Sequence, residues 1–379
     1  MVMDRLFALM KEKEASDIFI AVNSPIQIKV AGQMVPINQQ KMDNNTIMSL
    51  LAEVVSSDKL AVLDRENELN MGIPVAGVGS FRLSAFRQRG SISAVFRYIP
   101  YQIPALNTLH VPMILGDLIL EKRGLLLIVG ATGSGKSTTI AAMLDHRNET
   151  KAGHILTIED PIEFLFRNKK SIVNQREVGT DARSLEIALR NALRQAPDCI
   201  LIGEIRDKDT MSAALAYAQS GHLVVATLHA NNSYQALTRI INFFPIETRQ
   251  SLLPDIAGSL KAIISQRLIP SVDGGRRPAV EVMLNTRHVS ELIEQGEIGQ
   301  IKEGIEKSMS PGSQTFEQAL LALIRDGVVS QEDALAYADS ASNLYWLINN
   351  SKDGRTAPEP EPEPPKEEAA TFTEFTLNI

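Results

Sequence analysis

One eight-residue segment has the residue types and spacing of a phosphate-binding loop. Gly130-Ala131-Thr132-Gly133-Ser134-Gly135-Lys136-Ser137 matches the P-loop pattern in full, between an apolar run and a stretch with helical spacing. Glycines let the backbone N–H groups turn inward around a polyphosphate, and the N-terminus of a following helix adds partial positive charge. We therefore expect this loop and Thr138 to bind ATP. Lys136 would contact the β and γ phosphates, and the hydroxyl of Ser137 would bind Mg²⁺.

Two acidic segments follow other apolar runs, where a metal partner and a water-orienting group are needed. Residues 157–163 include Glu163, and Pro161 ends the preceding apolar run. Glu204 follows the run at 199–202 and resembles a Walker B acid, although Gly203 replaces the usual Asp. A single acid in such a position is more often a helix cap or a solvated charge. Two acids at strand ends beside a P-loop favour the catalytic interpretation.

Two histidines flank another apolar run, residues 223–228. An isolated histidine is more often structural than catalytic. His229 falls at the end of the run where the other polar groups are expected, so it could contact the γ-phosphate. His222 opens the opposite end of the run, and for it we favour a structural role. The two lack a helical i, i+4 spacing and have no cysteine nearby, which argues against zinc.

The expected elements place these groups on one sheet. Short, continuously apolar runs alternate with helical stretches from residue 114 onward, which is typical of an α/β domain with a parallel sheet. The first hundred residues instead show a helical pattern and then alternating strands, which predicts a smaller α+β domain with an antiparallel sheet. Prolines cluster at residues 100–113 and predict a linker. Residues 351–379 are rich in Pro and Glu and predict an extended acidic tail.

Composition narrows the function classes. The 379 residues carry a net charge of −7 and are 44% hydrophobic but only 5% aromatic. No overall basic field is present, so nucleic-acid binding is disfavoured. No apolar run approaches the roughly 20 residues of a membrane span, so we expect no transmembrane segment. The single cysteine, Cys199, fits a reducing compartment, which predicts a cytoplasmic protein with at most peripheral attachment to a membrane.

Four motifs in this order resemble the secretion ATPase superfamily, which drives type II secretion and type IV pili. Within it the chain resembles the PilT/PilU family of retraction ATPases over about residues 1–345. The matching segments are the Walker A loop at 130–137, the Asp box at 157–163, the Walker B segment at 200–207 and the His box at 221–229. The resemblance implies a twitching-motility motor that couples ATP hydrolysis to pilus retraction.

The resemblance also implies an architecture and residue roles. It implies a homo-hexamer of subunits that each have a PAS-like domain at 1–99 and a RecA-like domain at 114–350, with ATP held between them. By position, Glu163 would polarise the attacking water, Glu204 would act at Mg²⁺ and His229 would contact the phosphate region. Arg82 and Arg97 lie where family members supply cations to the γ-phosphate, as arginine fingers do.

One segment departs from the retraction ATPases proper. They carry Ala-Ile-Arg-Asn-Leu-Ile-Arg-Glu, whereas this chain has Thr286-Arg287-His288-Val289-Ser290-Glu291-Leu292-Ile293-Glu294. This difference and the acidic tail resemble the accessory, PilU-type branch, which implies a partner retraction ATPase and a platform protein of the inner membrane. Two alternatives stay open: a low-turnover ATP-binding subunit that assists a partner ring, and a RecA-like nucleic-acid translocase.

Overall fold

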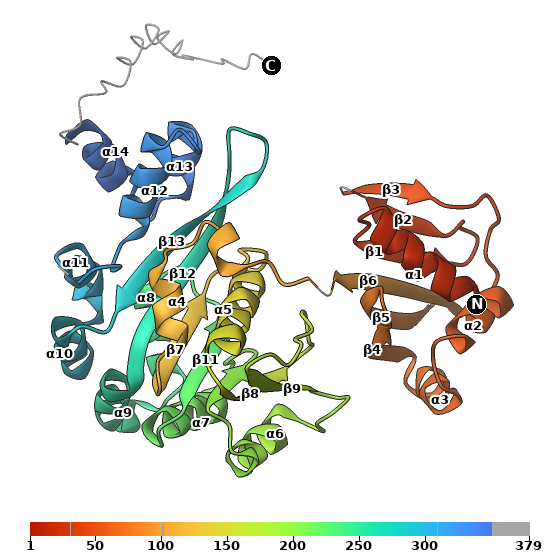
Figure 1. Ribbon diagram of the computed structural model, residues 1–379, viewed down its shortest axis with the longest axis horizontal. Coiled ribbons are helices and arrows are strands. Elements are labelled where there is room, and N and C mark those ends of the chain that lie inside the picture. Colours follow the sequence, from red (N-terminus) through yellow and green to blue (C-terminus); the bar gives the residue numbers. More distant parts are fainter. Residues whose placement is uncertain (31, 101, 309, 351–379) are drawn as a thin grey trace, which may run out of the picture.

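The computed structural model describes residues 1–30, 32–100, 102–308 and 310–350; the tail predicted at 351–379 lies outside the described residues. Two sheets organise the chain, one formed before residue 101 and one after it, and they lie side by side (Figure 1). The α/β fold class expected from the sequence is confirmed.

The first sheet is antiparallel and has the strand order β3-β2-β1-β6-β5-β4. Helix α1 covers one of its faces, because Phe7 stacks on Phe81 of β5 with ring centroids 4.0 Å apart. Alternate residues of β5 and β6, including Arg82 and Arg97, point to the opposite face. The elements are α1 (Val2–Glu12), β1 (Asp17–Ala21), β2 (Gln27–Val30), β3 (Gln33–Pro36), α2 (Asn44–Ala52), α3 (Ser57–Glu66), β4 (Glu68–Val75), β5 (Gly79–Gln88) and β6 (Ser91–Pro100).

The second sheet has seven strands in the order β13-β12-β7-β11-β10-β8-β9. Neighbours from β12 to β9 pair in parallel, and only β13 runs antiparallel, at one edge. Its strands are β7 (Gly124–Val129), β8 (Gly153–Glu159), β9 (Ser171–Glu177), β10 (Cys199–Ile202), β11 (Leu223–Leu228), β12 (Leu260–Pro270) and β13 (Arg276–Leu284).

Helices cover both faces of this sheet, which explains why its central strands are apolar without alternation. Leu125 and Leu127 of β7 join the core cluster on the side of α6 to α10, while Leu126 and Ile128 join the cluster formed with α4 and α5. The helices are α4 (Ile114–Ile119), α5 (Lys136–Thr150), α6 (Leu185–Ala192), α7 (Lys208–Gln219), α8 (Ser233–Asn242), α9 (Ile246–Ser259), α10 (Arg287–Gln295) and α11 (Ile301–Glu306), with short 3-10 turns at Leu106–Thr108, Leu193–Gln195 and Ile298–Gln300.

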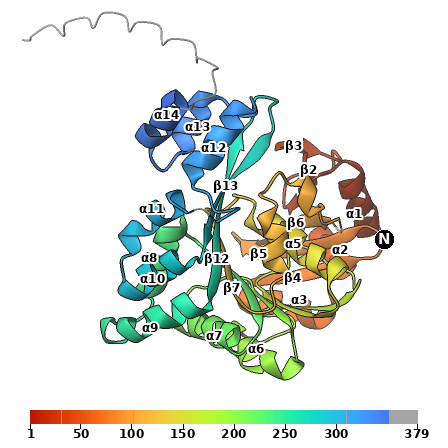
Figure 2. The same cartoon turned by 60° about the vertical axis from the view of Figure 1, so that its left-hand side comes forward.

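Three further helices form a C-terminal unit: α12 (Phe316–Arg325), α13 (Gln331–Tyr337) and α14 (Ala341–Asn350). Their buried residues Phe316, Leu320 and Leu344 pack with Ile269 of β12 and Ala279 of β13. The C-terminal unit therefore lies near the turn that joins β12 to β13, and both ribbon views show it there (Figures 1 and 2).

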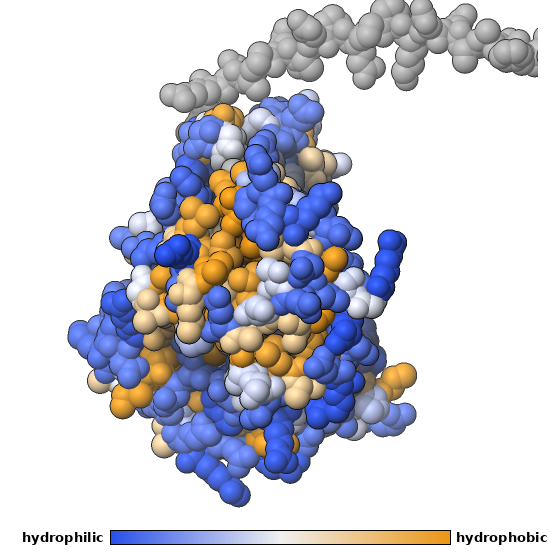
Figure 3. Space-filling model, turned by 90° about the vertical axis from the view of Figure 1, so that its right-hand side faces the viewer, coloured by the Kyte–Doolittle hydropathy of each residue, from blue (hydrophilic) through white to orange (hydrophobic). Residues whose placement is uncertain are grey.

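The outer surface mixes polar and apolar residues. Figure 3 shows one side of the molecule, on which a hydrophobic area lies between hydrophilic margins. Among the described residues, no helix combines the length and the apolar character that a membrane crossing requires.

Candidate nucleotide-binding and catalytic site

The predicted phosphate-binding loop connects β7 to α5, and its glycines are required by its shape. Gly133 and Gly135 have positive φ angles of 79° and 87°, a region that other residues rarely adopt. A Cβ atom at Gly130 would lie 2.5 Å from the carbonyl oxygen of Gln266, and a Cβ atom at Gly135 would lie 2.7 Å from the side-chain Nε2 of the same glutamine. The loop is therefore packed tightly against β12, and side chains at these two positions would displace it.

A cavity of about 540 Å³ adjoins the loop at the carboxyl ends of the parallel strands. Polar side chains from four strand ends face it: Lys136 after β7, His229 after β11, Glu204 after β10 and Glu163 after β8. The remaining predicted loop residues that line it are Thr132, Gly133, Gly135, Ser137 and Thr138. Gly130, Ala131 and Ser134 instead line a smaller cavity of about 260 Å³, together with Asn231, Gln266, Arg267, Arg276 and Tyr337.

Lys136 folds back over the loop. Its Nζ donates hydrogen bonds to the carbonyl oxygens of Gly130, at 2.8 Å, and Ala131, at 2.9 Å. Burial lowers the pKa of Lys136, while the charges of Glu204 and Glu163 act in the opposite direction. A cation held at the rim of a glycine loop, at the start of a fifteen-residue helix, fits a polyphosphate.

Glu204 lies at the centre of a charged group at the end of β10. Its Oε1 is 3.2 Å from Nε2 of His229, and its Oε2 accepts a hydrogen bond of 2.6 Å from Nε of Arg206. Nη1 of Arg206 also lies 3.7 Å from Oδ2 of Asp160. Gly203 permits this arrangement, because a Cβ atom there would lie only 3.2 Å from Cα of Glu159 on the neighbouring strand.

The acidic segment after β8 contributes two carboxylates with different surroundings. Glu163 is exposed and lines the cavity. Glu159 also lines it, but its Oε1 accepts hydrogen bonds from Thr157 Oγ1 at 2.6 Å and Gln175 Nε2 at 3.2 Å. Burial is the main cause that raises the pKa of Glu159. We therefore expect Glu163, rather than Glu159, to be free to contact a ligand.

The two predicted arginine fingers lie opposite each other on β5 and β6, but neither lines the cavity within one chain. Arg97 is committed to Asp17, with Nε 2.9 Å from Oδ1. Arg82 is half-buried, and its Nε has no hydrogen-bond partner among the described residues. Burial lowers the pKa of Arg82, and the nearby charge of Glu163 partly offsets this. Arg82 therefore shares the electrostatic surroundings of the cavity, whereas Arg97 has a structural partner.

His222 lies at the opposite end of β11 and does not line the cavity. Its Nδ1 is 3.0 Å from Ser220 Oγ and 3.3 Å from the carbonyl oxygen of Tyr217. These local contacts at the start of the strand agree with the structural role favoured from the sequence.

Gln266 is a site residue that the sequence did not indicate. Its Nε2 donates to the carbonyl oxygen of Ser134 at 2.9 Å, and its Oε1 accepts from Thr139 Oγ1 at 2.8 Å. Gln266 thus fixes both the phosphate-binding loop and the first turn of α5. No local pattern distinguishes this glutamine, because its partners are more than 120 residues away in the chain.

The site offers few protein ligands for a metal ion. The residues that the structure describes contain no cluster of three or more His, Cys, Asp or Glu able to hold one. Mg²⁺ usually keeps several waters and binds through one or two protein groups plus substrate phosphates, so Ser137 and Glu204 beside the loop fit this ion.

Comparison with known proteins agrees with this geometry. The family described as "Type II/IV secretion system protein" matches residues 1–336. The chain belongs to this family. Among its members, the type IV pilus ATPase PilU of Pseudomonas aeruginosa is 46% identical over 349 residues, which cover 92% of this chain and 91% of PilU. PilT of the same organism is 38% identical over 339 residues, which cover 89% of this chain and 98% of PilT.

Solved structures of the family have the same fold. The crystal structure of the pilus retraction motor PilT with bound ADP matches 90% of this chain and 99% of its own, with a TM-score of 0.84 and 38% identity. The ATPase DotB of Legionella pneumophila matches 88% of this chain and 94% of its own, with a TM-score of 0.77 and 28% identity. The RecA-like domain with a preceding smaller domain, expected from the sequence, is therefore confirmed.

Proposed function

We propose that this protein is an ATP-hydrolysing motor for type IV pilus retraction and twitching motility, of the accessory, PilU type. The observation that carries the proposal is the cavity in which Lys136, Glu163, Glu204 and His229 meet from four neighbouring strand ends. The likeness to PilU and PilT along most of the chain supports the pilus as the machinery that this motor acts on.

Each side chain then has a role that follows from its position. Residues 130–138 hold the phosphates of ATP, with Lys136 on the β and γ phosphates. Ser137 and Glu204 hold Mg²⁺, which neutralises charge on the transferring phosphoryl group when bound. Glu163, exposed at the cavity, polarises the attacking water, and His229 contacts the phosphate region.

Arg82 and Arg97 supply positive charge to the transferring group as arginine fingers. Since neither lines the cavity within one chain, this role requires either movement of the first domain or donation from a neighbouring subunit. The half-buried Arg82, with an unpartnered Nε, is better placed for it than Arg97.

The motor acts as a homo-hexamer with two moving parts. Residues 1–99 and 114–350 rotate as rigid domains about the linker at 100–113, since hinges absorb backbone change while domains keep their packing. The apolar area in Figure 3 supports subunit contact. We place the ring in the cytoplasm, peripheral at the inner membrane, where it pushes on the pilus platform protein beside a partner retraction ATPase.

Turnover by the purified full chain tests the proposal. Lys136→Ala removes the cation from the loop, and we expect ATPase activity to fall at least about 100-fold because phosphate charge is no longer neutralised. Lys169→Ala is the matched control, since Lys169 lies on the surface of the same domain, paired with Asp145 and Glu149. Equal turnover by Lys136→Ala and Lys169→Ala would remove the basis of the proposal.

A further inference from the structure

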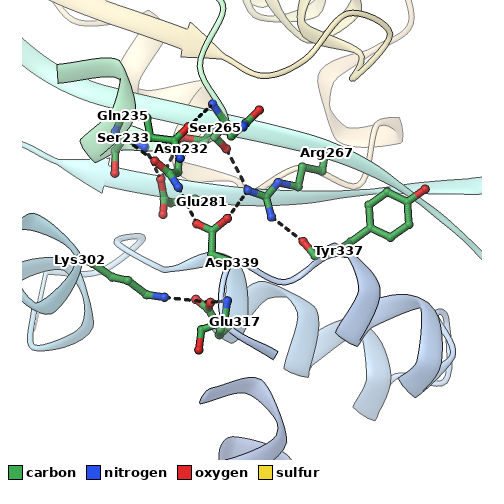
Figure 4. Close-up of polar contacts among 12 residues, drawn as sticks. Asn232, Ser233, Gln235, Ser265, Arg267, Glu281, Lys302, Glu317, Tyr337 and Asp339 are labelled. Carbon is green, nitrogen blue, oxygen red and sulfur yellow. Dashed lines mark hydrogen bonds and ion pairs between the residues drawn. The ribbon is translucent and has the colours of Figure 1, made fainter. Parts of the chain in front are cut away.

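Asp339, between α13 and α14, connects the C-terminal unit to the edge of the nucleotide site. Its Oδ1 forms an ion pair with Nη2 of Arg267 on β12, and its Oδ2 accepts a hydrogen bond of 2.9 Å from Nδ2 of Asn232. The side chains of Arg267 and Asp339 are only 19% and 12% exposed. Figure 4 shows the Asp339 carboxylate between Asn232 and Arg267. One carboxylate therefore joins three segments that are far apart in the sequence.

Arg267 is held on several sides. It donates to the carbonyl oxygens of Tyr337 and, at 3.1 Å, Asn231, and its guanidinium carbon lies 3.9 Å from the centre of the Phe316 ring. Two of these partners, Tyr337 and Phe316, belong to the C-terminal unit, while Asn231 belongs to the loop after β11. Because guanidinium donors have a fixed planar geometry, Arg267 sets the distance between that loop and the C-terminal unit.

The loop that Asp339 and Arg267 hold is the one that carries His229. It runs from His229 to Asn232, whose Oδ1 caps α8 by accepting from the N–H of Gln235 at 3.1 Å. At its other end, the carbonyl oxygen of His229 accepts from Nη1 of Arg239 at 2.8 Å. Helix α8 therefore contacts both ends of the loop, and the Asp339 and Arg267 contacts add a second support at Asn231 and Asn232.

We propose that Asp339 and Arg267 are positioning residues that hold His229 against Glu204, so that the C-terminal unit controls turnover. This inference rests on the proposed function, because it assigns a support to a residue of the same site. A buried ion pair contributes little net stability, since desolvation offsets most of its attraction, whereas loss of one partner leaves an uncompensated charge. Such a pair is therefore better suited to fixing geometry than to stabilising the fold.

The experiment combines Asp339→Asn with His229→Ala in the full chain. Asp339→Asn alone should lower kcat about 10-fold and leave KM for ATP within about 2-fold, because the P-loop contacts are untouched. In the His229→Ala background it should lower kcat no further, because residues that act through one group show non-additive effects. Arg267→Lys, which keeps the charge but not the planar donors, should give an intermediate loss.

Lys302→Met is the matched control. Lys302 pairs at 2.9 Å with Glu317, a carboxylate of the C-terminal unit that is only 1% exposed, and among the described residues its ion-pair partner is Glu317 and not a residue of the 229–232 loop. This variant should lower the melting temperature and keep kcat within about 2-fold of wild type. Amide exchange gives a readout besides turnover: residues 229–232 should lose protection in Asp339→Asn and keep it in Lys302→Met.

The outcomes separate this inference from the proposed function. Additive losses in Asp339→Asn and His229→Ala, or unchanged protection of residues 229–232 in Asp339→Asn, would overturn the positioning role while wild-type turnover still supports the motor. If the wild-type protein does not hydrolyse ATP and Lys136→Ala gives the same result, the proposed function is overturned, and this inference with it.

Discussion

Nε2 of His229 lies 3.2 Å from Oε1 of Glu204, although the two residues follow different strands. They meet because β10 and β11 are parallel neighbours, paired from Cys199–Leu223 to Ile202–Ala226, so that both chains leave the sheet at the same edge. The other oxygen of Glu204 is held by Arg206. The carboxylate is thus held by Arg206 on one side and faces His229 on the other.

Glu204→Gln should lower kcat about 100-fold, because the amide keeps the shape of the carboxylate but not its charge toward metal and His229. ADP affinity should change by less than about 3-fold, since the loop and Lys136 remain. Turnover and ADP titration measure the two effects. Glu186→Gln, on the exposed face of α6, is the control. A normal kcat in Glu204→Gln would contradict this role.

Gln266→Leu should weaken the support of the phosphate-binding loop. The variant leaves Thr139 Oγ1 and the Ser134 carbonyl without their partners, at a cost of about 1–3 kcal/mol for buried groups. We expect a lower melting temperature and a KM for ATP raised several-fold. Gln175→Leu provides a comparison, because Gln175 supports Glu159 instead of the loop. An unchanged KM in Gln266→Leu would show that the loop holds its shape without this residue.

Glu159 should make stability depend on pH. Its pKa is raised by burial from the ordinary value of 4.5, so between pH 4.5 and the raised pKa the folded state holds a proton that the unfolded state has lost. Stability from this group is complete below pH 4.5 and is lost as the pH rises through the raised pKa. Glu159→Gln has no carboxyl group to ionise, so it removes this loss of stability at high pH. In urea unfolding, its advantage over wild type should therefore be larger at about pH 8 than at about pH 5. An advantage that does not change with pH would contradict a raised pKa.

Cys199 should be inert toward thiol reagents in the folded protein. It is 0% exposed, and burial raises the pKa of its thiol from 9.0 to about 11. The thiolate fraction at about pH 8 then falls about 100-fold, and access is blocked as well. Labelling should proceed only after unfolding in denaturant. Rapid labelling of native protein would mean that the sheet opens locally around β10.

Arg82→Ala and Arg97→Ala should have different effects. Arg82→Ala should lower kcat about 100-fold or more, because it removes a cation near Glu163 that supplies positive charge to the transferring phosphoryl group. Arg97→Ala should lower kcat by less than Arg82→Ala does, and it should lower stability by about 1 kcal/mol because it leaves the nearly buried Asp17 without its exposed partner. Steady-state kinetics and thermal melts separate the effects. A larger fall in kcat in Arg97→Ala than in Arg82→Ala would show that Arg97, and not Arg82, is the main arginine finger.

The sequence by itself determined which polar residues lie at the strand ends. A P-loop is a local pattern, since its glycines meet backbone demands that depend on neighbours in the chain, and continuous apolar runs predicted the buried parallel strands. Glu163, Glu204 and His229 could be named for the same reason: each directly follows such a strand or its turn. The antiparallel first domain was also readable, from the alternation in β1, β2, β5 and β6.

Only the tertiary structure decided which distant residues support that chemistry. Gln266 under the loop, Asp17 against Arg97, and Asp339 with Arg267 beside Asn232 join positions far apart in the chain. Such contacts follow from the order of strands in a sheet and from the packing of the C-terminal unit on β12 and β13. No local spacing encodes them, because strand order is chosen by burial of the whole sheet and not by the residues that later meet.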